Sequence, residues 1–359
     1  MTSVIVATPF ALSAITSSAG GTTKGIVDPM RVLVLGGTAF VGRAVVDEAR
    51  TRGHQITVLN RGHQPPPEGT TALIGDRRTP NGLATLEGGT WDLVIDTWSG
   101  APAVVRAAAK TLSGHAGHYT YVSSRSVYAD AGPIPRTETA AVVDASPDSS
   151  DETDYAAAKR GAELAADQNF DGPVLHARAG LIIGPHEDVG RLPWWLNRTA
   201  RGGPTLAPGP RDLPLQYIDA RDLATFLLDA AAHGRTGPYN LTSLSGHTTM
   251  GELLDTANTI TGGHADLRWT DPEPILEAGI TPWTDLPIWF PPGNDHAFVH
   301  RGDVSKAIAA GLRLRPIGDT IADTWAWLQT IGGTPPQRPD RNPVGLDPNR
   351  EAALLASIE

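Results

Sequence analysis

The stretch RVLVLGGTAFVGR, residues 31–43, decides the fold that we predict for this chain. Its apolar run, Val32 to Leu35, ends at glycine, which is typical of a buried parallel strand. Two glycines then allow a tight turn, and from Phe40 onward apolar residues recur with helical spacing until Gly53. A strand, a glycine turn and a helix start together aim backbone N–H groups at a pyrophosphate. The stretch therefore predicts a dinucleotide site. The residues expected to line it are Gly36, Gly37, Thr38, Ala39, Phe40, Val41 and Gly42.

The second strand, expected over residues 55–60, bears on which dinucleotide is bound. About 20 residues past the glycines, an acidic residue would accept hydrogen bonds from the adenosine ribose and repel a 2′-phosphate. This chain has Asn60 and Arg61 there. Because a guanidinium pairs with a phosphate in bidentate fashion, NADP(H) is favoured and NAD(H) remains possible. The alternative is that Arg61 is a solvated turn residue.

Strands and helices alternate along the first half of the chain. Strands are expected over residues 71–74, 91–96 and 118–123, with a helix over 104–112. This order predicts an α/β fold with a Rossmann-type, doubly wound parallel sheet. Ligands gather at the carboxyl ends of such strands. The polar residues expected there are Asp76, Arg77, Asp96 and Ser124, of which the first three are assigned to the cofactor site.

Composition narrows the classes of function. The net charge of −10 disfavours nucleic acid as the main partner, because phosphate binding needs clustered Lys and Arg. The absence of cysteine excludes thiolate ligands, and the scattered histidines predict no metal site. No apolar run is long enough for a membrane span. Residues 1–29 lack the basic start of a secretory signal, so we expect a disordered leader and a cytoplasmic protein.

A tyrosine and a lysine stand one helical turn apart in the alanine-rich run that begins at Tyr155. The helix predicted there puts Tyr155 and Lys159 on the same face. The positive charge of a lysine lowers the pKa of a nearby phenol, which makes the tyrosine a usable general acid or base. The pattern is common by chance. It gains weight from the glycine turn and from a hydroxyl such as Ser124.

Together these elements resemble an extended short-chain dehydrogenase/reductase of the NAD-dependent epimerase/dehydratase family. The resemblance covers residues 30 to about 330. It is carried by GGTAFVG at 36–42, VSSRSVY at 122–128, YAAAK at 155–159 and RAGLIIGP at 178–185, with later echoes in QYIDARD at 216–222 and DVSKA at 303–307. The resemblance implies Ser124 and Tyr155 on the reacting oxygen, with Lys159 holding the nicotinamide ribose. Ala39 replaces the middle glycine of the family pattern.

The resemblance also implies a domain plan. A Rossmann domain would cover residues 30–185, and the chain would return to this domain near residues 213–242 and 297–306. A smaller C-terminal α/β substrate domain would hold residues 186–212 and 243–330, with the active site between the two. Residues 331–359 are expected to form a Pro-rich tail and a terminal helix. The family pattern implies a homodimer through helices near residues 105 and 160.

Departures from the family pattern narrow the chemistry. Sugar dehydratases of the family carry an acidic pair where this chain has Arg125 and Ser126, so dehydration is disfavoured. Nucleotide-sugar members usually carry an asparagine where this chain has Leu181, which weakens that substrate class without excluding it. Leu181, His186 and Trp194 are weak candidates for substrate contact. Several aromatic residues follow, Trp194, Trp195, Trp283, Trp289 and Phe290; about half are expected in the core and the rest could line an apolar pocket.

The leading hypothesis is an NADP(H)-dependent oxidoreductase, of carbonyl reductase or alcohol dehydrogenase type, that acts on a small molecule through Ser124, Tyr155 and Lys159. The first alternative is a nucleotide-sugar 4-epimerase with bound NAD. A different class is a non-catalytic binder of NADP(H) or RNA, because the opening glycine motif also resembles atypical members that bind RNA. The acidic charge and the retained Tyr155 and Lys159 argue against that class.

Overall fold

Seven parallel strands form the central sheet of the computed structural model, which describes residues 28–130, 132 and 134–358. Their spatial order is β11-β6-β5-β4-β1-β2-β3. Four strands come from the first hundred residues, β1 (Arg31–Leu35), β2 (Gln55–Asn60), β3 (Thr71–Ile74) and β4 (Leu93–Asp96). The other three are β5 (Tyr119–Tyr121), β6 (Val174–Ala179) and β11 (Gly237–Leu241). The sheet order reverses next to β1, so its carboxyl end lies at the switch point where such sheets bind ligands.

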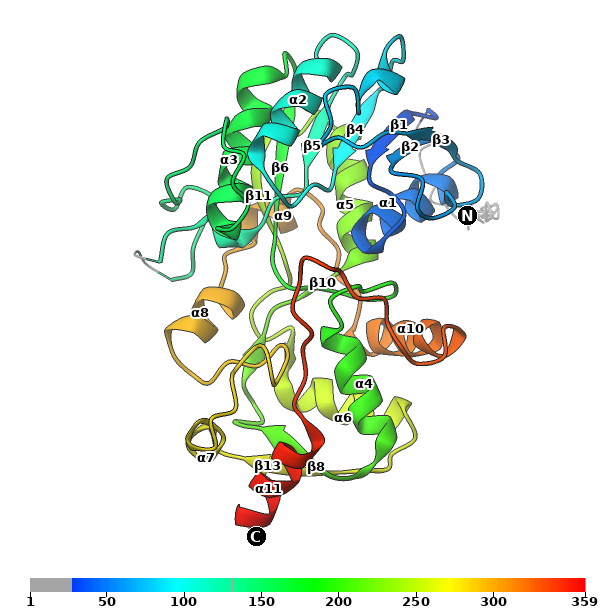
Figure 1. The fold of residues 1–359 in the computed structure, drawn as a ribbon. Coiled ribbons are helices and arrows are strands. Elements are labelled where there is room, and N and C mark those ends of the chain that lie inside the picture. The colour runs from blue at the N-terminus through cyan, green and yellow to red at the C-terminus, as the bar shows by residue number, and fades with distance from the viewer. Residues whose placement is uncertain (1–27, 131, 133, 359) are drawn as a thin grey trace, which may run out of the picture.

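Helices cover both faces of this sheet (Figure 1). Helices α1 (Phe40–Thr51) and α5 (Ala220–Ala232) pack together on one face, and α2 (Pro102–Leu112) and α3 (Tyr155–Asn169) pack on the other. Strand β1 shows why both faces need cover. Val32 and Val34 belong to the core under α1 and α5, while Leu33 and Leu35 belong to the core under α2 and α3. Successive side chains of a strand point to opposite faces, so a continuous apolar run needs cover on both sides. The Rossmann-type, doubly wound fold is confirmed.

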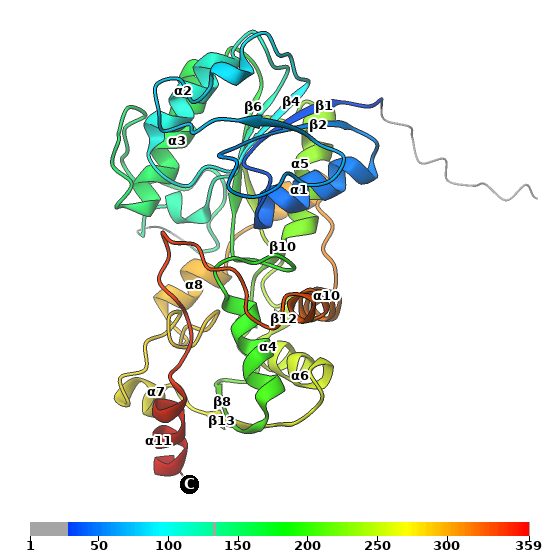
Figure 2. The same ribbon diagram turned by 45° about the vertical axis from the view of Figure 1, so that its right-hand side comes forward.

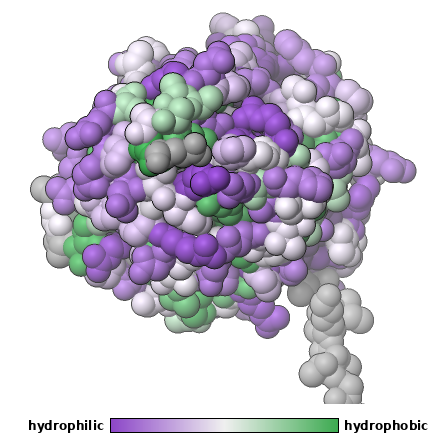
Figure 3. All heavy atoms as spheres, turned by 90° about the horizontal axis from the view of Figure 1, so that it is seen from below, coloured by the Kyte–Doolittle hydropathy of each residue, from purple (hydrophilic) through white to green (hydrophobic). Residues whose placement is uncertain are grey.

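A second lobe, which we call the lower lobe, lies below the sheet in Figures 1 and 2. The sheet and the helices that cover it form the upper lobe. The main helices of the lower lobe are α4 (Arg191–Arg201), α6 (Met250–Ile260) and α10 (Ile317–Thr330), and β8 (Gly203–Pro208) pairs in parallel with β13 (Ala265–Thr270). The core of this lobe contains Trp195 and Trp289, both fully buried. Each indole N–H donates to a backbone carbonyl, as buried tryptophans require. Seen from below, the lobe has a mostly hydrophilic surface with small hydrophobic patches (Figure 3).

Short elements complete the chain. Strands β7 (Ile182–Ile183) and β10 (Ile218–Asp219) pair in parallel where the chain passes between the lobes, and β9 (Pro214–Leu215) pairs with β12 (Thr248–Thr249). The remaining helices are α7 (Pro272–Glu277), α8 (Asn294–His300), α9 (Ser305–Ala309) and α11 (Pro348–Ile358), and the 3₁₀ turns are η1 (Ala84–Leu86) and η2 (Arg125–Val127).

Residues 333–347, which we call the strap, have no helix or strand. They leave α10, rise to the junction of the two lobes and descend to α11, as both ribbon views show (Figures 1 and 2). Near the top, Arg338 N–H donates to the carbonyl of Asp188 at 3.0 Å, and its side chain donates to Ser99 Oγ at 2.8 Å. The strap is therefore bonded to both lobes.

The predicted elements differ little from those observed. Helix α2 begins at Pro102, two residues before the predicted start, because proline suits the first turn of a helix. Of the predicted leader 1–29, residues 1–27 lie outside the described part of the chain. The division into two domains stays a prediction. Among the described residues, no helix is long and apolar enough to cross a membrane.

Candidate active site

The glycine turn after β1 has the shape of a phosphate cradle. Gly36 and Gly37 have φ values of +123° and +87°, which disfavour any side chain. A Cβ on Gly36 would lie 2.5 Å from Thr97 Oγ1, and one on Gly42 would lie 2.5 Å from the backbone nitrogen of Gly37. Helix α1 starts after Ala39 with no side-chain cap, so no capping side chain uses its first N–H groups. These features fit the pyrophosphate of a dinucleotide.

The other residues predicted for the turn divide by burial. Phe40 and Val41 are each 8 % exposed and pack in the core below the turn, whereas Thr38 is half-buried. Phe40 is a non-glycine residue with a positive φ of +30°. This conformation is rare for a bulky side chain and marks the sharp change from turn to helix.

The ends of β2 and β3 offer polar groups near this turn. Asn60 Oδ1 accepts a hydrogen bond from the Gly62 N–H at 2.7 Å, while its Nδ2 is buried with no partner among the described residues. A hydrogen-bond acceptor of a bound cofactor would satisfy that amide. Arg61 is exposed. Hydrogen bonds from Arg78, together with the charges of Arg78 and Arg61, lower the pKa of Asp76 to about 2.

Asp96 and Arg77 form a buried pair at the end of β4. The guanidinium donates to both carboxylate oxygens, at 2.7 and 2.6 Å, and Asp96 is fully buried. The carboxylate also accepts from Tyr119 Oη at 2.5 Å and from the Trp98 N–H at 2.9 Å. Burial opposes ionisation, but the Arg77 charge and these bonds lower the pKa of Asp96. The contact of these two side chains with a cofactor stays a prediction.

The Ser-Tyr-Lys residues come from two elements at the carboxyl edge of the sheet. Ser124 follows β5 and caps η2, because its Oγ accepts from the Ser126 N–H at 3.1 Å. Tyr155 is the first residue of α3, which packs against η2, and Lys159 lies one turn further along the same face. Ser124 and Tyr155 are half-buried, so both residues remain partly open to solvent.

Lys159 is buried and held at two points. Its Nζ donates to the carbonyl of Trp98 after β4 and to that of Val122 after β5, both at 2.7 Å. Burial lowers the pKa of Lys159 to about 7, and Asp96 offsets this effect only in part. The charges of Arg338 and Arg341 lower the pKa further. The side chain is therefore fixed at the carboxyl ends of β4 and β5, and Lys159 stands one turn along α3 from Tyr155.

Glu163, one turn beyond Lys159, ties α3 to the sheet. Its fully buried carboxylate accepts from Ser123 Oγ at 2.7 Å and from Arg178 at 2.9 Å through two nitrogens. Arg160 donates to it as well, at 2.9 Å. This network crosses from α3 to β5 and β6, and so it fixes the helix that presents the tyrosine and the lysine.

Arg125, which stands where related dehydratases carry an acid, points away from this site. It is 4 % exposed and donates to the carbonyls of Phe298 and Val299 at the end of α8, at 3.0 and 2.7 Å. Cations near the carboxyl end of a helix are favourable. Arg125 therefore joins the lobes. The neighbouring Ser126 instead bonds Ser124, with 3.1 Å between the hydroxyl oxygens.

The weak substrate candidates lie in three settings. Leu181 is 5 % exposed in the core of the lower lobe, and His186 packs against Trp327 with the rings tilted by 52° and 5.2 Å between ring centres. Trp194 is half-buried beneath Gly345 of the strap, where a Cβ would meet its Nε1 at 2.1 Å. Substrate contact by these residues stays a prediction. Of the aromatic residues, Trp195 and Trp289 lie in the core as expected for about half of them, while Trp283 and Phe290 stack at 5.2 Å and are only partly buried. The lining of an apolar pocket by the others stays a prediction.

The strap adds a residue that sequence reasoning missed. The guanidinium carbon of Arg341 lies 4.5 Å from the centre of the Tyr155 ring. The two residues are far apart in sequence, and no motif or periodicity around Arg341 points to the site. Only the path of the chain after α10 brings them together.

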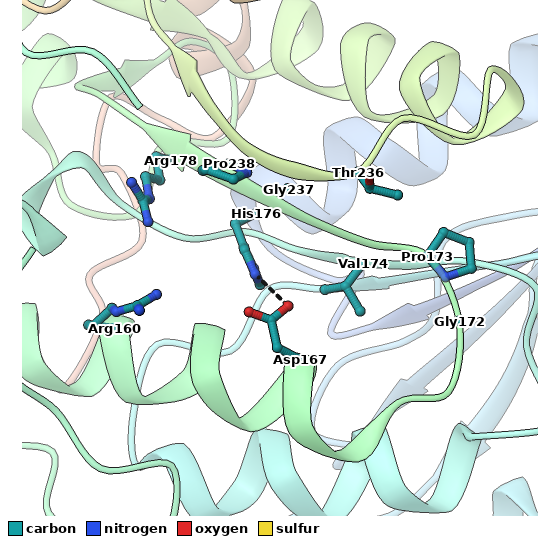
Figure 4. Close-up of a pocket in the computed structure, with 10 residues that line it drawn as sticks. All are labelled: Arg160, Asp167, Gly172, Pro173, Val174, His176, Arg178, Thr236, Gly237 and Pro238. Carbon is teal, nitrogen blue, oxygen red and sulfur yellow. Dashed lines mark hydrogen bonds and ion pairs between the residues drawn. The ribbon is translucent and has the colours of Figure 1, made fainter. Parts of the chain in front are cut away.

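A hollow of about 520 Å³ lies elsewhere, at the sheet edge formed by β6 and β11 (Figure 4). His176 Nε2 bonds Asp167 of α3 there at 2.9 Å. None of the predicted site residues lines this hollow, and we assign it no role in the chemistry.

The central sheet and the helices that cover it define a Rossmann-type fold. A model of the NAD dependent epimerase/dehydratase family matches residues 32–242, and the chain belongs to that family. It is accordingly an NAD(P)-dependent enzyme of the short-chain dehydrogenase/reductase type. No curated protein matches the chain in sequence.

Solved structures show the same fold at low identity. The Bordetella bronchiseptica enzyme WbmG, in complex with NAD and UDP, has a TM-score of 0.64 and 19% identity, covering 87% of this chain and 97% of that one. UDP-N-acetylglucosamine 4-epimerase from Bacillus cereus has a TM-score of 0.62 and 16% identity, with coverage of 84% and 99%. UDP-glucose 4-epimerase from Thermus thermophilus, in complex with NAD, has a TM-score of 0.60 and 19% identity, with coverage of 84% and 99%.

Proposed function

We propose that the protein transfers hydride between a nicotinamide cofactor and a secondary alcohol or carbonyl group of a small molecule. The observation that carries the proposal is the position of Lys159. Its ammonium is buried and bonded to carbonyls that follow β4 and β5, and the residue stands one helical turn from Tyr155 on α3. In a Tyr-x-x-x-Lys pair formed by chance on the surface, the lysine would be exposed to solvent. Lys159 is only 3 % exposed and donates to two backbone carbonyls.

The cofactor supplies the hydride donor or acceptor, and the chain supplies binding and proton chemistry. The turn from Gly36 to Gly42 would hold the pyrophosphate through its N–H groups. Ser124 Oγ would donate a hydrogen bond to the substrate oxygen and fix its position. Tyr155 Oη would donate a proton to that oxygen in the reductive direction and accept one in the oxidative direction. The Lys159 ammonium would favour the phenolate that remains after donation.

Preference for NADP(H) is a finer proposal that rests on Arg61. The exposed guanidinium lies near enough to Asp76 to influence its pKa, and no acidic residue ends β2 to repel a 2′-phosphate. Two of the three solved structures named above, from Bordetella bronchiseptica and Thermus thermophilus, are complexes with NAD, which favours the other cofactor. Fluorescence titration of the protein with NADPH and NADH separates the two. Arg61→Ala should weaken NADPH binding by about tenfold and leave NADH unchanged. Equal affinity of the wild type for both would refute the role of Arg61.

The second candidate is a nucleotide-sugar 4-epimerase. It is favoured by the similarity to enzymes whose structures were solved as UDP-sugar epimerases or with UDP. Such an enzyme would convert UDP-glucose without net change in added cofactor, whereas a reductase would consume NADPH or NADH in step with a carbonyl substrate. Nuclear magnetic resonance of the sugar and the absorbance of the nicotinamide, recorded on the same samples, distinguish the two. A homodimer and a cytoplasmic location stay predictions.

A further inference from the structure

Two arginines from separate parts of the lower lobe bring positive charge to the neighbourhood of Tyr155. Arg191 is the first residue of α4, and Arg341 belongs to the strap. The Arg341 guanidinium lies over the Tyr155 ring at 4.5 Å, and the Arg191 guanidinium lies 5.0 Å from the centre of the Trp283 ring. The charges of Arg341 and Tyr155 both influence the pKa of Arg191, so the three groups share one neighbourhood.

Neither guanidinium has a hydrogen-bonded carboxylate within the described part of the chain. The closest acid to Arg341 is Asp340, at 3.9 Å, and that carboxylate is already bonded by Arg338 at 3.0 and 2.6 Å. The Nε of Arg191 is buried and has no partner among the residues that the structure describes. Glu187 lies next to it but accepts from the backbone N–H of Arg191, at 2.7 Å, and not from its side chain.

This arrangement is unfavourable as it stands. Burial lowers the pKa of Arg191, and the repulsion from Arg341 acts in the same direction. The charges of Glu187 and Asp188 oppose this effect only in part. Burial also raises the pKa of Glu187 to about 7, so this carboxyl supplies only part of a counter-charge at neutral pH. A cation that is partly removed from water and has no bonded counter-ion is destabilising. An oxyanion held by both guanidiniums would remove the repulsion and fill their vacant donors.

The strap holds Arg341 in this place. On one side of Arg341, Arg338 bonds Ser99 of the upper lobe at 2.8 Å, and on the other the Gly345 N–H donates to the carbonyl of Thr284 at 2.8 Å. Because the segment is bonded on both sides, the guanidinium needs little further ordering to bind a ligand.

We propose that Arg191 and Arg341 form an oxyanion subsite beside Tyr155, and that the substrate carries a carboxylate or phosphate group near its reacting carbon. The inference rests on the proposed function only in taking Tyr155 as the reacting end of the site. It deepens that function by naming the charge of the substrate.

The test uses the full chain and two probes, inorganic phosphate and malonate, with chloride at matched ionic strength as the reference. The midpoint of thermal unfolding is measured against probe concentration, because a ligand that binds only the folded state raises it. The wild type should be stabilised by one or both probes beyond chloride. Arg341→Ala should weaken this binding by about tenfold or more, since hydrogen bonds to charged groups are lost. Arg341→Lys should restore part of the phosphate effect, because an ammonium still attracts phosphate.

The control is Arg313→Ala, which removes an exposed arginine outside the strap and should bind the probes as the wild type does. Stabilisation by phosphate alone identifies a phosphate group in the substrate, and stabilisation by malonate alone identifies a carboxylate. Equal midpoints in the probes and in chloride, or unchanged binding in Arg341→Ala, would overturn the subsite. Hydride transfer with those results would leave the proposed function standing. Probe binding that depends on Arg341, without hydride transfer to any carbonyl tested, would support the subsite and count against the proposed function.

Discussion

Replacing Glu163 by glutamine should destabilise the protein by about 3 kcal/mol at pH 7. The side chain is fully buried and accepts four hydrogen bonds, from Ser123, Arg160 and two nitrogens of Arg178. Burial alone would raise the pKa of Glu163, but the bonds from Arg178 and the nearby positive charges lower it from 4.5 to about 2. At 1.36 kcal/mol for each tenfold change in proton affinity, this difference contributes about 3 kcal/mol to folding. Removing one partner of a buried pair typically costs about 3–5 kcal/mol, which agrees.

The pH dependence has a defined sign. Because the folded pKa lies below the unfolded one, the stabilisation is present above about pH 4.5 and is lost as the pH falls toward 2. Urea unfolding, followed by tryptophan fluorescence, should therefore show a large difference between wild type and Glu163→Gln at pH 7 and a much smaller one near pH 3. Asp167→Asn is the matched control on the same helix, since Asp167 is 48% exposed and should cost less than about 1 kcal/mol. A Glu163→Gln effect that is below 1 kcal/mol, or that does not change with pH, would refute the reasoning.

Three further changes test other parts of the structure. Gly42→Ala places a Cβ 2.5 Å from the Gly37 nitrogen. The substitution should weaken NADPH or NADH binding by about tenfold in a fluorescence titration and lower the free energy of unfolding by only about 1–3 kcal/mol. Unchanged cofactor affinity would contradict the role of the glycine turn as a phosphate cradle. Glu351→Ala leaves Arg198, 5 % exposed, without its carboxylate and should lower the unfolding free energy by about 3–5 kcal/mol in urea; a loss below 1 kcal/mol would contradict the anchoring of α11. Because the folded pKa of Lys159 is about 7 against 10.5 unfolded, stability of the wild type relative to Lys159→Met should rise by about 2 kcal/mol from pH 7 to 9; a flat difference would contradict the burial of the ammonium.

The fold could be predicted because its signals are local. The run from Arg31 to Arg43 contains a strand, a turn and a helix start within thirteen residues, and the structure places β1 and α1 there. Alternation of strands and helices then restricts the sheet to parallel pairing with cover on both faces. The shared position of Ser124, Tyr155 and Lys159 also follows from local signals. Tyr155 and Lys159 lie on one face of α3, and Ser124 follows the carboxyl end of β5.

The contacts that could not be predicted join residues far apart in sequence. Arg125 bonds α8 across more than 170 residues, and Arg338 bonds Ser99 across 239. Neither arginine has a local pattern that reveals these distant partners, which are backbone carbonyls for Arg125 and one hydroxyl for Arg338. The position of Arg341 over Tyr155 likewise depends on the path of the strap, for which a Pro-rich composition indicates only an extended chain.

The central claim is that Tyr155 moves the proton during hydride transfer. The most direct measurement compares wild type and Tyr155→Phe in single-turnover reactions, with cofactor binding measured by fluorescence on the same preparations. We predict that the phenylalanine variant binds the cofactor with unchanged affinity and transfers hydride slower by about 10²–10⁴, the range that general acid–base catalysis supplies. Hydride transfer at the wild-type rate in Tyr155→Phe would contradict the account.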